Sequence, residues 1–205
     1  MSYLSEFLKN KSVGAVSSSS KSLGKYMFGN LDYSNAKVIV EFGGGQGVFT
    51  HEILKLINPE CKLLVFETNE AFCKKLKDTT QDDRALIIHD SAEKIGDYLQ
   101  KHNFEKADHI ISSLPLSMFS LELKEDILQN ATQFLSDRGQ FLQFQYAPFD
   151  YNRLKDHFGK VKMNFSIRNF SVRYRPHNVR HHAYGVAASP RAVCYPAVRV
   201  SLLLF

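Results

Sequence analysis

The chain has 205 residues, of which 44% are hydrophobic and 23% charged, with a formal net charge of +5 at pH 7. That length suits one globular domain with a full core and is too short for two ordinary ones. No stretch approaches the ~20 apolar residues that span a bilayer, and no secretion signal opens the sequence, so we expect a cytoplasmic protein.

Apolar strand-like runs alternate with helix-like segments through the first two-thirds of the chain. The predicted strands are residues 37–41, 63–67, 85–89, 109–112 and 140–144. The predicted helices are residues 48–57, 70–77, 92–101 and 121–135, the last stopped by Asp137-Arg138-Gly139. This alternation predicts an α/β fold of the Rossmann-like, doubly wound kind, with helices on both faces of a mainly parallel sheet.

The C-terminal part of the chain has a different composition from the rest. Residues 161–170 and 198–204 have the pattern of two final strands, which would bring the sheet to seven strands. One option is that these strands are antiparallel at the edge of the sheet. Residues 173–196 have no clear pattern. No acidic residue follows Asp156, and arginine is the main basic residue there. The alternatives are an anion-binding tail for nucleic acid or acidic lipid, a solvated end of the last strands, or a divergent or frame-altered terminus.

A glycine-rich turn follows the first strand in VIVEFGGGQGVFT at 38–50. Its glycines allow a ligand to approach the backbone closely, and they are Gly43, Gly44, Gly45 and Gly47. Val48 breaks the dinucleotide fingerprint, and no Gly-Lys-Ser/Thr follows to make a P-loop. Because Glu41 precedes the turn, we expect a cationic or amino-bearing ligand rather than a phosphate, and a sulfonium amino acid fits.

Acidic residues also end the second and third strands. Glu67 is placed to accept both hydroxyls of a ribose, and Asp90 is placed to accept the exocyclic amino group of adenine. With Thr68, Ser91 and Ser112, these acids and the glycine turn form the predicted cofactor site.

On these residues the chain resembles the class I S-adenosylmethionine-dependent methyltransferases over residues 38–144. The fourth strand runs into SSLPL at 112–116, where methyltransferases of base amino groups, such as the ribosomal RNA adenine dimethylases, carry Asn-Leu-Pro-Tyr or Asn/Asp/Ser-Pro-Pro-Tyr/Phe. Leu116 replaces the aromatic ring on which a flipped base stacks. That replacement weakens the nucleic-acid reading.

The sequence is more similar to the bacterial phospholipid N-methyltransferases, which methylate phosphatidylethanolamine. Similar stretches of that family match SSLPL, QFQY at 143–146 and VGAVSSSSKSL at 13–23. The family's usual Asn-Leu-Pro-Pro-Ala-like ending is not found in this chain.

The resemblance implies S-adenosylmethionine as cofactor and a lipid amine as methyl acceptor. Ser112, Ser113 and Leu114 would accept hydrogen bonds from the amine, and Tyr146 would face the cationic head group. Tyr146 as a partly buried strand residue is the alternative. We predict no metal, because neither the eight histidines nor the three cysteines have ligand spacing.

The remaining expectations concern partners and boundaries. Residues 3–11 place an apolar stripe on one helical face, which suits an interfacial helix or docking on the chain's own core. We divide the chain into a helical extension (1–30), a methyltransferase domain (31–170) and a basic segment (171–205). Our first hypothesis is methylation of a phospholipid at the inner face of the membrane. The second is methylation of RNA or protein, and the third is a non-catalytic binding module. The sequence leaves the oligomeric state open.

Overall fold

The computed structural model describes residues 28, 31–145, 150–165 and 199–204. Its core is a seven-stranded sheet in the order β3-β2-β1-β4-β5-β7-β6, in which all neighbouring strands are parallel. The strands are β1 (Val38–Phe42), β2 (Lys62–Phe66), β3 (Ala85–Ile88), β4 (Ala107–Ser112), β5 (Leu135–Gln145), β6 (Lys160–Phe165) and β7 (Arg199–Leu204). The predicted doubly wound α/β fold is confirmed, and its strand order reverses between β1 and β4.

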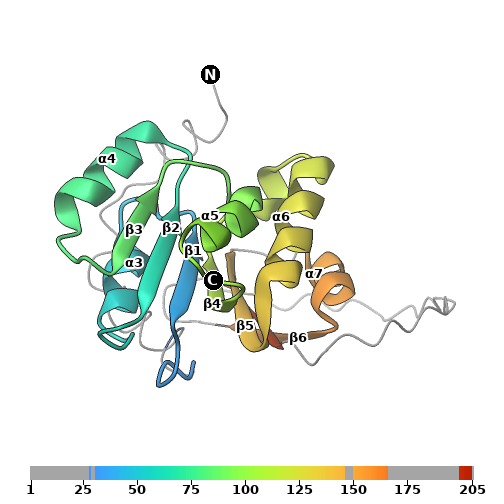
Figure 1. Ribbon diagram of the computed structural model, residues 1–205. Helices are drawn as coiled ribbons and strands as arrows, with labels where there is room; N and C mark the ends of the chain where they lie inside the picture. The colour runs from blue at the N-terminus through green and yellow to red at the C-terminus, as the bar shows by residue number, and fades with distance from the viewer. Residues whose placement is uncertain (1–27, 29–30, 146–149, 166–198, 205) are drawn as a thin grey trace, which may run out of the picture.

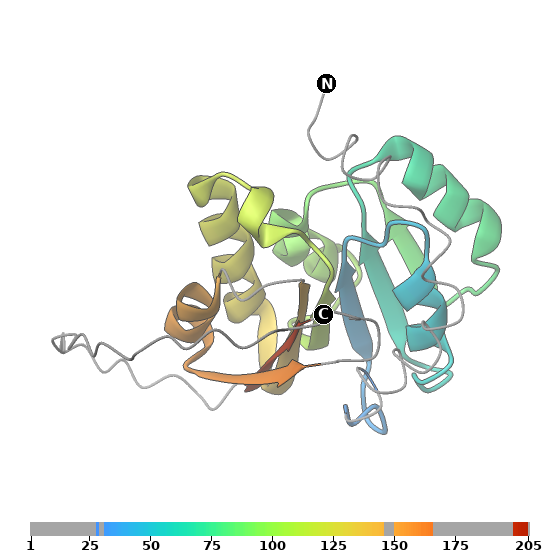
Figure 2. The ribbon, with the colours of Figure 1, turned by 180° about the vertical axis from the view of Figure 1, so that it is seen from behind.

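Helices cover both faces of the sheet (Figures 1 and 2). They are α3 (Val48–Leu54), α4 (Glu70–Thr79), α5 (Ile95–Lys101), α6 (Leu121–Phe134) and α7 (Tyr151–Phe158), with short 3₁₀ turns η2 (Ala92–Lys94) and η3 (Leu116–Met118). Buried side chains of α5, α6 and α7 share one core cluster with the sheet, and those of α3 and α4 share the other. The central strands are therefore buried on both sides, which explains why β1 and β2 are almost continuously apolar in sequence.

Local sequence signals fix several helix starts. The Asn69 side chain accepts a hydrogen bond from the Phe72 N–H and caps α4, and the Ser120 side chain accepts one from the Leu123 N–H and caps α6. Such caps satisfy backbone donors that have no partner within the helix.

The fourth helix ends within one residue of its predicted end, but the prediction of Asp137-Arg138-Gly139 as its stop is wrong. The helix α6 ends at Phe134, and β5 begins at Leu135, so the residues read as a helix stop lie in the strand. The pairing register between β4 and β5 shifts there. Gly139 lies so close to β4 that an added Cβ would be 2.7 Å from the Asp108 carbonyl oxygen, so this glycine serves close strand packing.

The last elements differ from expectation in two ways. The structure adds α7, which the sequence conceals because only Leu154 and Phe158 of its eight residues are buried. Both final strands are present, but they run parallel to β5 rather than antiparallel, and β7 lies between β5 and β6.

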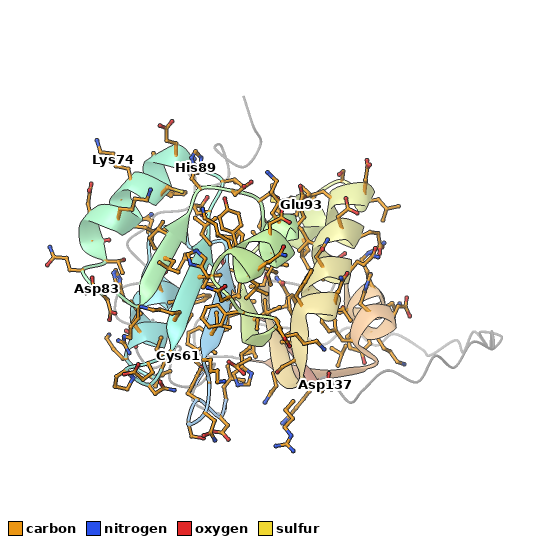
Figure 3. All side chains as sticks on the ribbon, viewed as in Figure 1. Cys61, Lys74, Asp83, His89, Glu93 and Asp137 are labelled. Carbon is orange, nitrogen blue, oxygen red and sulfur yellow. The ribbon has the colours of Figure 1, made fainter. Side chains whose placement is uncertain are left out.

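The two edges of the sheet differ in what they carry. In Figure 3 the labelled His89 and Glu93 mark the carboxyl edge, whereas Cys61, Asp83 and Asp137 mark the amino edge. Among the helices that the structure describes, none is long and apolar enough to cross a membrane. Four predicted features lie outside the described residues: the 3–11 helix, the 13–23 stretch, Tyr146 and the 173–196 segment.

Candidate active site

The glycine turn connects β1 to α3 at the carboxyl edge. The Gly43 and Gly44 N–H groups donate to the Phe66 carbonyl oxygen at 2.8 and 3.1 Å, which holds the turn against β2. A Cβ at Gly44 would lie 2.4 Å from Cγ1 of Val65, so this position needs a glycine for packing. Gly45 has φ +52° and nothing within 4 Å of an added Cβ, so it leaves open space into which a ligand fits.

Glu67 directly follows β2 and closes over this turn. Its Oε2 accepts the Gly45 N–H at 2.8 Å, and its Oε1 accepts the Asn69 N–H at 2.8 Å. The residue is only 8% exposed. Because a carboxylate has about four acceptor sites, both oxygens retain capacity for ribose hydroxyls.

Asp90 follows β3 and already has partners in the protein. Its carboxylate accepts from the Ser91 N–H, the Lys94 ammonium and the Tyr98 hydroxyl. The hydrogen bond from Lys94 holds the pKa of Asp90 below its ordinary value. An adenine amino group would therefore share this carboxylate with Lys94. The exposed Thr68 lies nearby, with its carbonyl oxygen 3.0 Å from Nε2 of His89.

Glu41 lies under the turn and is 1% exposed. The Thr50 hydroxyl donates to its Oε2 at 2.7 Å, but within the described part of the chain its Oε1 has no hydrogen-bond partner. Burial raises the pKa of Glu41 to about 8, and the nearby charge of Glu67 adds to the rise. A buried acidic oxygen without a donor beside an open glycine turn fits an amino-bearing, cationic ligand.

The predicted acceptor motif contacts the glycine turn. Ser112 ends β4 between Phe42 of β1 and Gln143 of β5. The Ser113 hydroxyl donates to the Gly43 carbonyl oxygen at 2.7 Å. An added Cβ at Gly43 would lie 3.0 Å from Ser113 Oγ and 3.1 Å from a methyl carbon of Leu114. The fold thus brings the predicted catalytic and cofactor-binding residues together, although they are 70 residues apart in sequence.

Two residues near the motif differ from what the sequence suggests. Leu116, which replaces the aromatic ring of the base-methylating enzymes, is 1% exposed and packs in the core, because the 3₁₀ turn that begins there directs it inward. Gln143 is fully buried and hydrogen-bonds the carbonyl of Leu114. In the sequence Gln143 stands out only as the first residue of the QFQY stretch, and nothing there indicates that it is buried or contacts Leu114.

A comparison with known protein families matches residues 15–174 to the methyltransferase small domain. The chain belongs to this family. It is a class I methyltransferase whose cofactor is S-adenosylmethionine, as the sequence predicts, and the open Gly45 turn and the acids that end β1, β2 and β3 fit this cofactor.

Three known proteins show what this chain is similar to. The methyltransferase is 28% identical over 170 residues to an ornithine lipid N-methyltransferase from Singulisphaera acidiphila, covering 82% of this chain and 88% of that protein. It is similar in fold to an S-adenosylmethionine-dependent O-methyltransferase from Thermotoga maritima, with a TM-score of 0.52 and 16% identity over 78% of this chain and 56% of that one. For the O-methyltransferase of a Brevibacillus brevis trans-AT PKS multienzyme in complex with S-adenosyl-L-homocysteine, the TM-score is 0.45 and the sequence identity 20%. The match covers 57% of this chain and 38% of that one. The methyltransferase thus spans less than two-thirds of the length of these two solved structures.

Within the described residues, no group of three or more His, Cys, Asp or Glu side chains could hold a metal ion.

Two exposed apolar side chains follow the acceptor motif. They are Met118 and Leu121, which are 42% and 61% exposed. An apolar rim made of Met118 and Leu121 therefore lies next to the motif in sequence, and it is open to a partner.

Proposed function

We propose that the chain transfers methyl groups from S-adenosylmethionine to the primary amine of a membrane lipid head group. The observation that carries this proposal is the similarity, over most of both chains, to an ornithine lipid N-methyltransferase. The phospholipid N-methyltransferase resemblance of the SSLPL and QFQY stretches supports the same acceptor chemistry.

The cofactor supplies an electrophilic methyl group on a sulfonium, and the chain's task is to position the two reactants. In this proposal Glu67 holds the ribose, Asp90 the adenine and the Gly43-to-Gly47 turn the amino-acid end, with Thr68 and Ser91 beside them. Alignment for in-line attack is the main contribution a protein can make to such a displacement.

In this proposal, hydrogen-bond acceptors around Ser113 receive the N–H groups of the neutral amine and so direct its lone pair toward the methyl group. The Ser113 hydroxyl already donates to Gly43, so its lone pairs are available to an N–H group. Because this bond joins the motif to the turn, it fixes the position of the amine relative to the cofactor. Tyr146 remains our candidate for contact with the cationic head group.

The apolar rim favours a lipid over RNA. Met118 and Leu121 are exposed apolar side chains that follow the motif in sequence, and in this proposal they contact the glycerol and acyl part of a lipid. A flipped base instead needs a flat aromatic ring, and position 116 supplies a leucine in the core. We further propose that the chain acts as a peripheral protein at the membrane surface, with residues 1–30 as membrane contact and lid.

The test offers separate acceptors to the full chain with labelled S-adenosylmethionine. Vesicles of phosphatidylglycerol would contain phosphatidylethanolamine, ornithine lipid or, as a control without a primary amine, phosphatidylcholine, and ribosomal RNA forms the last arm. We expect label in one or both amine lipids and none in phosphatidylcholine, with the signal lost in Glu67→Ala. Label in RNA alone would overturn the lipid assignment and favour the base-methylating alternative.

A further inference from the structure

The carbonyl of Leu114 is turned into the protein, and this decides which atoms of the motif are open. The Leu114 oxygen accepts a hydrogen bond from Gln143 Nε2 at 2.9 Å and another from the Leu116 N–H at 2.9 Å. A carbonyl oxygen has two lone pairs, so this one has no capacity left for a substrate amine. The prediction that Leu114 accepts the amine is therefore wrong for its carbonyl, and Ser112 is fully buried, so of the three predicted acceptor residues Ser113 is the one left open.

The hydrogen-bond partners of Gln143 fix the orientation of its side-chain amide. Its side-chain nitrogen also donates to the Phe144 carbonyl oxygen at 2.9 Å. Because both partners are carbonyl oxygens, which only accept, the NH₂ group must point toward them. The amide oxygen Oε1 is consequently left buried, and within the described residues it has no hydrogen-bond partner.

Stability alone does not account for this residue. Its two donated hydrogen bonds stabilise the fold, but its buried amide oxygen without a donor costs a comparable amount, and an apolar side chain of the same length would lose the former and avoid the latter. On the same face, Phe141 of β5 and Ile110 of β4 are apolar core residues, whereas Ser112, which pairs directly with Gln143 on β4, is buried and polar. A glutamine here therefore needs another reason, as do buried unsatisfied groups in general.

We infer that Gln143 is a positioning residue for methyl transfer, which locks the Leu114 peptide inward so that the Ser113 carbonyl and hydroxyl receive the acceptor amine. Gln143 acts through Leu114 and does not itself touch the substrate. This inference rests on the proposed function, because it names the residue that sets the geometry of the same acceptor site. The Ser113 bond to Gly43 then fixes those acceptors relative to the cofactor turn.

The first test compares Gln143→Met with Gln140→Met. Gln140 lies three residues earlier on β5, and the alternation of the strand directs its side chain to the opposite face. Among the described residues, its side chain forms no hydrogen bond to the motif. We expect Gln143→Met to lower kcat on the lipid amine about 10- to 100-fold, as small misplacements in aligned reactions do. Its KM, cofactor affinity and Tm should stay near wild type, and Gln140→Met should leave all four unchanged.

A second measurement needs no substrate. Hydrogen–deuterium exchange of the peptide that contains residues 112–118 should be faster in Gln143→Met, because the loop loses one of its anchors, while peptides of β1 and β2 keep wild-type exchange. If the methionine variant is too unstable, Gln143→Leu serves the same comparison.

The outcomes separate the two proposals. Wild-type kcat and wild-type exchange in Gln143→Met would sink the inference and leave the lipid methyltransferase assignment intact. A parallel loss of Tm, cofactor affinity and kcat would show a structural residue only and would also overturn it. If wild type methylates no lipid, the proposed function fails, and faster exchange of 112–118 at unchanged Tm would still show that Gln143 holds the Leu114 peptide.

Discussion

Polar side chains lie at both edges of the sheet, but the two edges differ in how fully these side chains are hydrogen-bonded. At the amino edge, one carboxylate oxygen of Asp108 accepts the N–H groups of Lys37 and Val38 at 2.6 and 2.9 Å. The buried His109 connects the Asp32 carbonyl through Nε2 to the Gln140 N–H through Nδ1, both at 3.1 Å. These side chains tie the chain's entry into β1 to β4 and β5.

Arg84 completes the amino edge. Its guanidinium donates to the carbonyl oxygens of Leu54, the last residue of α3, and of Ile57 and Asn58, which follow this helix. It also forms an ion pair with Asp82, and that hydrogen bond lowers the pKa of Asp82 to about 2. The polar groups here have their partners, apart from the buried hydroxyl of Tyr33, for which the described residues provide none.

The carboxyl edge contains the unsatisfied groups. One oxygen of Glu41, the amide oxygen of Gln143 and, at the start of α7, one oxygen of Asp150 are buried without a donor among the described residues. The glycines with positive φ between β1 and α3 lie at the same edge. Unsatisfied acceptors and unusual backbone weaken a fold, so their concentration where α/β proteins bind ligands indicates that this edge is organised for binding and the other for stability.

Arg84→Met should have the largest effect, because it removes the donor for three carbonyl oxygens at once. We expect the free energy of unfolding to fall by about 3 kcal/mol, near 1 kcal/mol for each lost hydrogen bond. Chemical denaturation measures this, and calorimetry should show cofactor affinity unchanged. A loss of affinity without a loss of stability would contradict the division between the edges.

Glu67→Ala tests the opposite edge. We expect cofactor affinity to fall by about 1.5–3 kcal/mol, the range for hydrogen bonds to a charged group. Glu70→Ala is the matched control, because Glu70 is exposed at the start of α4 and should leave affinity unchanged. Equal affinity of the Glu67 variant and wild type by calorimetry would remove Glu67 from the cofactor site.

The two edges should also respond to pH with opposite sign. Glu41 has its pKa raised from 4.5 to about 8 by burial, so its contribution to stability is full below its ordinary pKa and is lost as pH rises toward 8. Burial lowers the pKa of His109 below 6.5, so its contribution is full above 6.5 and is lost as pH falls. Each slope is limited to about 1.4 kcal/mol per pH unit for one proton.

Unfolding measured from about pH 5 to pH 9 separates these contributions. Glu41→Gln should remove the loss of stability that accompanies rising pH between 4.5 and about 8, and His109→Gln should remove the loss that accompanies falling pH below 6.5. If the two variants change the slope of stability against pH in the same direction, the assignment of opposite titrations to the two edges is wrong.

Leu121→Ser should have the smallest effect. The residue is an exposed member of the apolar rim, so the fold should not change, but KM for lipid in vesicles should rise about two- to fivefold as apolar contact is lost. Leu56→Ser is a control, because Leu56 is also exposed but follows α3 at the amino edge. The same KM shift in both variants would exclude a specific role for the rim.

The sequence by itself determined the features that local patterns encode. Alternating apolar runs set the order of strands and helices, and buried strands that end in Glu41, Glu67 and Asp90 implied a shared edge, because parallel strands all place their carboxyl ends on one side. The glycine spacing indicated a turn open to a ligand. These are properties of short segments, so they can be recognised from the sequence without knowledge of the fold.

Only the tertiary structure decided how those segments meet. The Ser113 bond to Gly43 and the Gln143 bond to Leu114 join residues 70 and 29 positions apart, and no local pattern encodes such partners. The burial of Leu116 depends on a 3₁₀ turn that packs against the core, and the helix α7 depends on contacts of only two apolar residues. Hydrogen bonds and packing between distant segments are set by the strand order, so the geometry of the acceptor site follows from the fold.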